Sequence, residues 1–224
     1  MQPNTAALRK RVFLVDDHPL VREWLTNLIN QQTGLMVCGE AESGPEAREK
    51  ILALRPDVAI VDIALKDSSG IELIKDLKQS CPEVAVLVLS MHEESHYAER
   101  ALRAGARGYI MKRETTRKVV AAIGQVLEGK LCISETIAAA MATQFVEGKT
   151  LASGSPVEQL SDRELEVFEL LGQGRTTRQI AESLRVSLKT VQAYCARIKE
   201  KLNLDSATEL LREAVRWHES THKG

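Results

Sequence analysis

The most restrictive feature of the sequence is the apolar run Val-Ala-Ile-Val at positions 58–61, which Asp62 follows directly. A short β-branched run without a polar face is typical of a parallel strand that is buried on both sides. Similar runs alternate with amphipathic stretches at helical spacing. These runs cover residues 12–15, 36–39, 84–89 and 108–111. The alternation predicts an α/β domain with a doubly wound, five-stranded parallel sheet.

Polar residues follow four of the five predicted strands. They are Asp16 and Asp17 after the first strand, Asp62 after the third, Ser90 after the fourth and Lys112 after the fifth. The carboxyl ends of the strands form the ligand crevice of an open α/β sheet. We therefore expect three carboxylates, one hydroxyl and one ammonium group to lie along one edge of the sheet.

Crowded carboxylates repel one another unless a cation neutralises them, and oxygen ligands of this kind suit Mg²⁺. Such a metal can shield an incoming phosphoryl group, so that Asp62 can act as a nucleophile while Ser90 and Lys112 contact phosphoryl oxygens. The alternative is that Asp16 and Asp17 are only helix-cap or turn residues and that Lys112 is a solvated surface lysine. The occurrence of polar residues at four strand ends favours phosphoryl transfer.

The segments that carry these residues resemble the receiver domain of bacterial two-component response regulators. They are Leu-Val-Asp-Asp-His-Pro-Leu-Val-Arg at 14–22, Val-Asp-Ile at 61–63, Leu-Ser at 89–90 and Gly-Ala-Arg-Gly-Tyr-Ile-Met-Lys at 105–112. The resemblance covers residues 11–129 and implies a flavodoxin-like sheet of strand order 2-1-3-4-5. It also implies site roles: Asp62 as phosphoacceptor; Asp16, Asp17, Asp62 and the backbone carbonyl of Ala64 as Mg²⁺ ligands; Ser90 and Lys112 as phosphoryl contacts; and Tyr109 as the aromatic switch residue.

One position departs from the receiver pattern. Lys66 stands four residues after the phosphoacceptor, where receivers commonly have proline. We expect Lys66 to change kinase docking or the lifetime of the phosphoryl group without abolishing phosphorylation. His18, His92 and His96 could suggest a metal or phosphorelay site, but loop or cap positions are the simpler interpretation.

The C-terminal part of the sequence lacks strand patterns and is predicted to be helical. Residues 130–158 form a linker with a helix at 134–145 and a small, polar, proline-bearing stretch at 148–156. Ser161 and Glu164 fit a capping box that begins a helix. Further helices are predicted at 177–184, 188–202 and 206–217. The three-residue turn between the first two of these predicts a helix-turn-helix module.

The region between Arg185 and Asn203 contains five cations and one anion, although the whole chain has a formal net charge of −1. A basic helix after a tight turn suits duplex phosphates, and a solvated helix face is the alternative. The segments at 160–167, 174, 180–181, 190–191 and 201–202 resemble the LuxR-type DNA-binding domain, here covering 159–217. The whole chain thus resembles a response regulator of the NarL/FixJ family.

Recognition helices present their N-terminal part to base edges and use flanking cations for phosphates. This geometry predicts groove contacts by Lys189, Gln192, Ala193 and Ala196, and backbone contacts by Thr190, Arg197 and Lys201. Many family members have Lys where Gln192 stands and His where Tyr194 stands. Because Gln suits adenine, we expect Gln192 to shift base preference and to add less salt dependence than Lys would. We expect Tyr194 to pack rather than to contact a phosphate.

The sequence therefore predicts a transcription regulator, not an enzyme, that a histidine kinase switches by Mg²⁺-dependent phosphorylation of Asp62. The predicted partners are double-stranded DNA, the kinase and a second copy of the phosphorylated chain. No run approaches the length of a membrane span, and we expect a cytoplasmic protein without a membrane partner. The four widely spaced cysteines are expected to be small apolar residues rather than metal ligands. The alternatives are a phosphorylation-independent regulator with a vestigial pocket and an aspartyl-phosphate phosphohydrolase.

Overall fold

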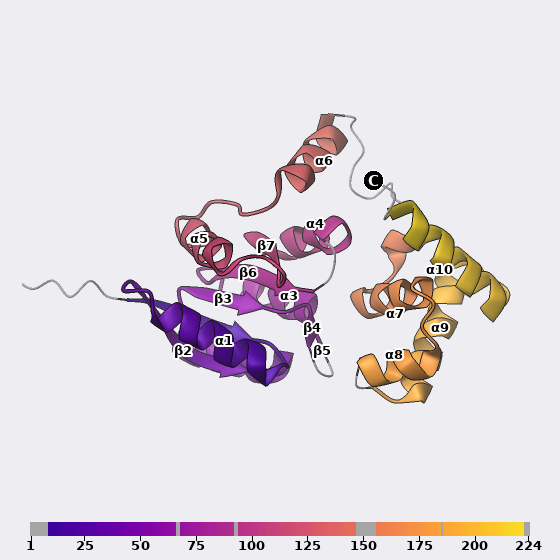
Figure 1. The fold of residues 1–224 in the computed structure, drawn as a ribbon, viewed down its shortest axis with the longest axis horizontal. Coiled ribbons are helices and arrows are strands. Elements are labelled where there is room, and N and C mark those ends of the chain that lie inside the picture. Colours follow the sequence, from indigo (N-terminus) through magenta and orange to yellow (C-terminus); the bar gives the residue numbers. More distant parts are fainter. Residues whose placement is uncertain (1–8, 66–67, 92–93, 147–155, 185, 222–224) are drawn as a thin grey trace, which may run out of the picture. The chain divides into compact units, whose positions relative to one another are not determined.

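The computed structural model describes residues 9–65, 68–91, 94–146, 156–184 and 186–221 (Figure 1). The chain forms two compact units, with the boundary between Thr143 and Gln144. In the described residues, no helix has the length and apolar character needed to cross a membrane. The small, polar, proline-bearing stretch at 148–156 lies outside the described residues except for Pro156.

The first unit is a five-stranded parallel sheet with helices on both faces. Its sheet strands are β1 (Lys10–Val15), β2 (Leu35–Ala41), β3 (Val58–Val61), β6 (Ala85–Ser90) and β7 (Gly108–Met111). The strand order β2-β1-β3-β6-β7 is the predicted order 2-1-3-4-5 once only sheet strands are counted, and this confirms the predicted fold. Two short antiparallel strands, β4 (Ala64–Leu65) and β5 (Ser68–Ser69), form a hairpin that the sequence pattern did not indicate.

Alternating apolar residues of the central strands face two helical layers. Helices α1 (Pro19–Asn30) and α5 (Thr116–Leu127) contribute apolar side chains to one continuous buried cluster with β1, β3, β6 and β7. Helices α2 (Gly44–Leu54), α3 (Gly70–Ser80) and α4 (Glu94–Ala104) pack side by side on the opposite face. Pro19 is the first residue of α1, as predicted, because a first-turn amide needs no helical partner. Helix α6 (Glu135–Val146) crosses the boundary between the two units and begins one residue later than predicted.

The second unit is all-helical. It contains a 3₁₀ turn, η1 (Pro156–Gln159), and the helices α7 (Asp162–Gly172), α8 (Thr177–Ser183), α9 (Leu188–Leu202) and α10 (Ala207–Thr221). The predicted capping box of Ser161 and Glu164 is present at the start of α7. A second capping box, of Thr176 and Gln179, starts α8. The core of the second unit includes the completely buried residues Phe168, Ile180, Val191 and Ile198.

Candidate functional site

The strand ends bring the predicted polar residues of the first unit together. Asp16, Asp62 and Lys112 each follow the last residue of a strand, and Ser90 is the last residue of β6. The pairing of β6 with β7 places Ser90 and Lys112 next to each other at the edge of the sheet. Ser90 lies opposite Met111, and the Ser90 carbonyl accepts a 2.8 Å hydrogen bond from the Lys112 amide. Ser90 is completely buried, and Asp16 and Asp62 are each 3% exposed.

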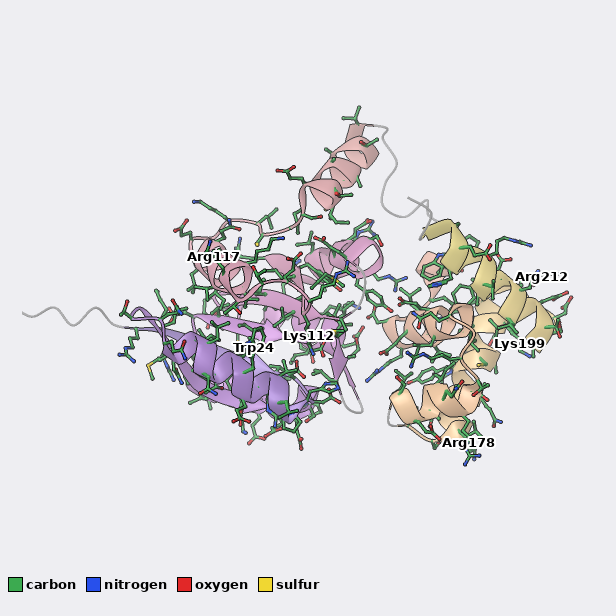
Figure 2. All side chains as sticks on the ribbon, viewed as in Figure 1. Trp24, Lys112, Arg117, Arg178, Lys199 and Arg212 are labelled. Atoms are coloured by element: carbon green, nitrogen blue, oxygen red, sulfur yellow. The ribbon has the colours of Figure 1, made fainter. Side chains whose placement is uncertain are left out.

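Lys112 joins two of the carboxylates. Its Nζ lies 2.6 Å from Asp16 Oδ2 and 2.6 Å from Asp62 Oδ2. Burial alone would lower the pKa of Lys112, but the Asp62 and Asp16 carboxylates outweigh it and raise the pKa above its ordinary value. Lys112, labelled in Figure 2, is therefore a buried ammonium group held between two carboxylates.

Asp17 and His18 complete the acidic cluster. His18 Nδ1 lies 2.7 Å from Asp17 Oδ1 and 3.3 Å from Asp16 Oδ1. Asp16 Oδ1 also accepts a 2.9 Å hydrogen bond from the His18 amide, so Asp16 has the local turn role as well as its place in the pocket. His18 is the N-cap residue of α1, in agreement with its interpretation as a cap histidine.

The donor set suits a hard cation. One potential ligand atom from each of Asp16, Asp17, His18 and Asp62 lies within 4.8 Å of the others, and three of these are carboxylate oxygens at buried residues. Mg²⁺ commonly binds a few carboxylates and keeps several waters. The residues present therefore fit Mg²⁺, and His18 is a neighbour that the sequence did not place in this cluster.

The loop after Asp62 folds back tightly against it. A side chain at Gly70 would place a Cβ 2.0 Å from the Asp62 carbonyl oxygen, so only glycine fits there. The Gly70 amide donates to the Ile63 carbonyl at 2.8 Å, and the Ala64 amide approaches Asp62 Oδ1 at 3.4 Å. This turn positions Ala64, whose carbonyl was predicted as a metal ligand. Lys66 lies outside the described residues, as does His92.

Tyr109, the predicted switch residue, lies in the middle of the pairing between β7 and β6, opposite Val88. It is 2% exposed. The aromatic ring is thus already inside the protein and is more deeply buried than the half-buried alternative. Any switching movement of this residue would start from a buried position.

In the second unit, α9 carries the predicted DNA-contact face. Val191 and Ile198 are completely buried, seven residues apart, and fix which side of α9 faces outward. The residues with exposed positions on α9 include Lys189, Gln192, Ala193, Ala196 and Arg197. Thr190 is partly buried; its amide donates to Ser187 Oγ at 3.0 Å, and its hydroxyl lies 2.7 Å from the same atom. Tyr194 is also partly buried, which agrees with packing.

Lys201 differs from the other predicted cationic DNA contacts because the described residues give it an ion-pair partner. Its Nζ lies 2.6 Å from Glu164 Oε2 and 3.2 Å from the Gln159 carbonyl oxygen. Burial would raise the pKa of Glu164, but hydrogen bonds from Lys201 and Ser161 outweigh it and lower the pKa. Lys201 therefore braces the end of α9 against the start of α7, a role that the sequence did not indicate.

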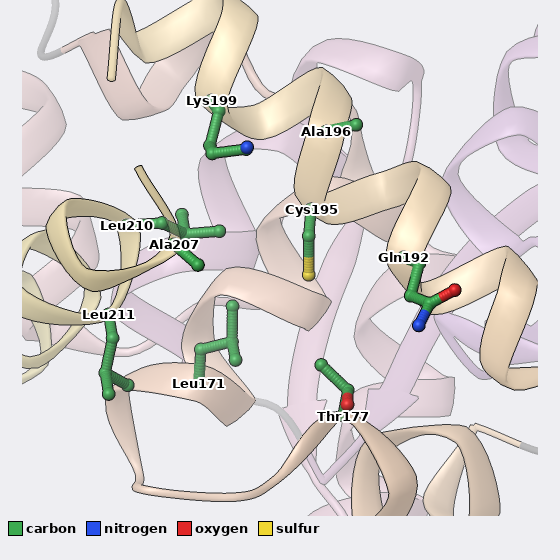
Figure 3. Close-up of a pocket in the computed structure, with 9 residues that line it drawn as sticks. All are labelled: Leu171, Thr177, Gln192, Cys195, Ala196, Lys199, Ala207, Leu210 and Leu211. Atoms are coloured by element: carbon green, nitrogen blue, oxygen red, sulfur yellow. The ribbon is translucent and has the colours of Figure 1, made fainter. Parts of the chain in front are cut away.

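A cavity of about 250 Å³ lies beside the predicted recognition surface (Figure 3). Residues of α7, α8, α9 and α10 line it: Leu171, Thr177, Gln192, Cys195, Ala196, Lys199, Ala207, Leu210 and Leu211. Gln192 and Ala196 thus contribute both to this cavity and to the exposed side of α9. The cavity was not predicted from the sequence.

Both units match known families. The description "Response regulator receiver domain" matches residues 12–124, and "Bacterial regulatory proteins, luxR family" matches residues 158–214. The chain belongs to the response-regulator family. This confirms the resemblance to a two-component regulator with a receiver domain and a LuxR-type DNA-binding domain, a family of transcription regulators.

Individual known proteins are similar to this response regulator over part or nearly all of its length. Oxygen regulatory protein NreC of Staphylococcus epidermidis is 33% identical over 211 residues, which are 92% of this chain and 97% of the relative. A LuxR-family two-component response regulator from an Aurantimonas species is 35% identical, with a TM-score of 0.57 over 62% of this chain and 99% of its own. RcsB of Salmonella enterica serovar Typhimurium, solved bound to promoter rprA with the phosphomimetic BeF3⁻, is 24% identical with a TM-score of 0.57. It covers 91% of this chain and 97% of its own and is similar in fold.

Proposed function

We propose that a histidine kinase switches this response regulator by transferring a phosphoryl group to Asp62, and that the switch controls binding to double-stranded DNA. The observation that carries the proposal is the position of Lys112, whose ammonium lies 2.6 Å from both Asp62 and Asp16, with Asp17 beside them. A buried carboxylate, Asp62, that is paired with a buried cation and lies next to the acidic residues Asp16 and Asp17 can accept a phosphoryl group and retain it.

The chemistry follows from the groups around Asp62. A carboxylate oxygen of Asp62 attacks the phosphorus of a phosphohistidine; the new O–P bond replaces the P–N bond, and the departing imidazole takes up a proton. Bound Mg²⁺ would supply positive charge that offsets the repulsion between the carboxylates and the phosphoryl oxygens. Asp16, Asp17, Asp62 and the carbonyl of Ala64 are the residues proposed to hold it.

Lys112 must change partners when Asp62 is modified. The phosphoryl group adds a charge of about −1.5 to −2. Lys112 then gives up its contact with Asp16 and pairs with a phosphoryl oxygen, while the buried Ser90 hydroxyl donates to another. Tyr109 repacks within the interior. The free energy for the switch comes from these exchanged contacts.

The output is DNA binding by α9. We propose that Lys189, Gln192, Ala193 and Ala196 face base edges in the major groove, and that Thr190, Arg197 and Lys201 lie near the backbone. Lys201 either keeps its ion pair with Glu164 when it approaches the DNA backbone or exchanges Glu164 for a phosphate. LuxR-type modules read paired half-sites, so we propose that the phosphorylated protein binds as a dimer. RcsB, which is similar in fold, is named as bound to promoter rprA in the presence of the phosphomimetic BeF3⁻.

The test is DNA binding by the purified full-length protein with and without beryllofluoride and Mg²⁺. We expect tighter binding and dimerisation in the treated parent and no response in Asp62→Ala. Asp76→Ala, which removes an exposed carboxylate of α3, is the matched control and should respond like the parent.

Two results would contradict the proposal. Equal DNA binding in all samples would mean that Asp62 does not gate DNA access, and the receiver pocket would then be vestigial. Sustained multiple turnover of a phosphate ester would instead identify a phosphohydrolase that uses the same carboxylates.

A further inference from the structure

The segment after α5 forms an additional edge on the sheet of the first unit. We name residues 131–134 the strap. Cys132 forms a parallel bridge with Gly108 of β7. The Tyr109 amide donates to the Cys132 carbonyl at 2.8 Å, and the Cys132 amide donates to the Arg107 carbonyl at 2.9 Å. The strap thus covers backbone groups of β7 that an edge strand would otherwise leave open.

Gly108 makes this close approach possible. A Cβ on Gly108 would lie 2.9 Å from the Cys132 carbonyl oxygen and 3.0 Å from the Cys132 Cβ. Real Cβ atoms do not approach backbone oxygens so closely without displacing them. Because Gly108 has no side chain, the strap can lie close enough to β7 to form its hydrogen bonds.

The other end of the strap is fixed to α4. The Ser134 amide donates to Glu94 Oε1 at 2.9 Å, 40 residues away in the sequence. Ser134 Oγ in turn accepts from the Ile137 amide at 3.2 Å at the start of α6. Glu94 also acts on the strap electrostatically: burial raises the pKa of Cys132, and the Glu94 charge raises it further. A carboxylate at the N-terminus of α6 is favourable for the helix dipole.

One anchor of the strap lies on β7, which carries Tyr109, and the other lies on α4, the helix that follows Ser90 in the chain. Tyr109 belongs to β7 and supplies a strap hydrogen bond through its own amide. Glu94 is the first residue of α4 and follows Ser90 by four positions. A displacement of about 1 Å between α4 and β7 stretches a 2.9 Å hydrogen bond beyond the range in which N–H···O contacts stabilise. The strap is therefore sensitive to small relative movements of these two elements.

We propose that the strap is a latch that phosphorylation of Asp62 opens. This inference rests on the proposed function and specifies how the state of the pocket reaches the linker. In the resting protein, Glu94 and β7 hold residues 131–134 and so fix the start of α6. Rearrangement of Ser90, Tyr109 and Lys112 around the phosphoryl group shifts α4 against β7 and breaks the bond between Glu94 and Ser134. The released α6 then changes the constraint on the DNA-binding domain that follows it in the chain.

Amide hydrogen exchange of the full-length protein, with and without beryllofluoride and Mg²⁺, tests the latch. We expect exchange in a peptide spanning 129–137 to accelerate by about tenfold on treatment, because local opening exposes protected amides. Glu94→Ala should show fast exchange there without treatment, and its ratio of DNA affinities with and without beryllofluoride should fall toward one. Glu94→Gln retains an oxygen acceptor and should behave like the parent. Glu99→Ala is the control on the same helix, because Glu99 pairs with Arg103 instead.

A second variant acts on the other anchor. Gly108→Ala leaves Glu94 in place, but its Cβ would lie 2.9 Å from both the Cys132 carbonyl oxygen and Leu87 Cδ1. It should push Cys132 away and also release the strap without treatment. Slower exchange around Asp62 on treatment reports beryllofluoride binding and separates the two proposals. Without that slowing, the proposed phosphorylation of Asp62 fails. If the slowing occurs, while strap exchange stays constant and Glu94→Ala keeps the full DNA response, the latch is overturned and the phospho-switch stands.

Discussion

The receiver pocket and the exposed face of α9 hold their charges differently. In the pocket, Lys112, Asp16 and Asp62 form ion pairs with side chains that are at most 8% exposed. On α9, Lys189 and Arg197 are exposed, and neither has an ion-pair partner among the described residues. Buried charges interact strongly and are weakly screened by salt, whereas exposed charges are screened. Removal of one charge from the pocket therefore acts on the protein's own stability, whereas the α9 cations act mainly when phosphates are present.

The largest effect is expected from Lys112→Met, which removes the buried cation while keeping the size of the side chain. Leaving two carboxylates buried without their cation should lower the free energy of unfolding by about 3–5 kcal/mol. Urea denaturation of the receiver transition measures this loss. Lys75→Met is the matched control: Lys75 pairs with Glu72 at 2.7 Å on the surface, and its removal should cost about 0–1 kcal/mol. If both variants lost a similar free energy of unfolding, buried and exposed ion pairs would not differ in their effect on stability.

The stability difference between the parent and Lys112→Met should also depend on Mg²⁺ and on pH. Added Mg²⁺ should restore more stability to Lys112→Met than to the parent, because the metal replaces the missing positive charge. The pKa of Lys112 is raised in the folded protein above its ordinary value of 10.5. Its contribution is therefore complete below that value and is lost as the pH rises through the folded pKa. The difference between parent and Lys112→Met should stay constant around neutral pH and shrink only in strong alkali.

A smaller effect is expected from the two lysines of α9. Lys201→Met should lower the melting temperature of the DNA-binding domain, because it removes the partner of Glu164. Lys189→Met should leave that temperature unchanged and reduce the slope of log affinity against log salt by about one. Calorimetry and DNA titration at several salt concentrations separate the two roles. A reduced salt slope in Lys201→Met would identify Lys201 as a phosphate contact as well as a brace.

The Glu164 side of this brace has its own pH dependence. The pKa of Glu164 is lowered from its ordinary value of 4.5, so its contribution is present above that value and is lost as the pH falls through the folded pKa. Acid should therefore remove the difference in melting temperature between the parent and Lys201→Met.

The smallest effect is expected from Gln192→Ala. A bidentate Gln–adenine contact is worth about 1–3 kcal/mol of discrimination at one base pair, while the total affinity changes less. Selection from a pool of random duplexes should show relaxed preference at one position in each half-site. Gln173→Ala, at an exposed position after α7, serves as the control. Unchanged preference in Gln192→Ala would exclude Gln192 from base recognition.

Much of this structure could be predicted from the sequence. The run at 58–61 is strand β3 in full, and α9 spans the predicted residues 188–202. Hydrophobic patterns with a period of two or 3.6 residues, capping residues and prolines act over a few neighbouring residues. They can therefore be recognised in the sequence alone. The polar ends of four strands were also predictable, because parallel strands present their carboxyl ends to the same edge of the sheet.

What the sequence by itself determined about this protein was the type and order of its elements and which polar residues would meet at the strand ends. Only the tertiary structure decided which atoms pair: Lys112 with Asp62 across 50 residues, Lys201 with Glu164 across 37, and Ser134 with Glu94 across 40. It also decided that Gly108 admits the strap and that Gly70 packs on Asp62. Such contacts depend on the relative placement of packed elements to within about an ångström, and no local pattern carries that information.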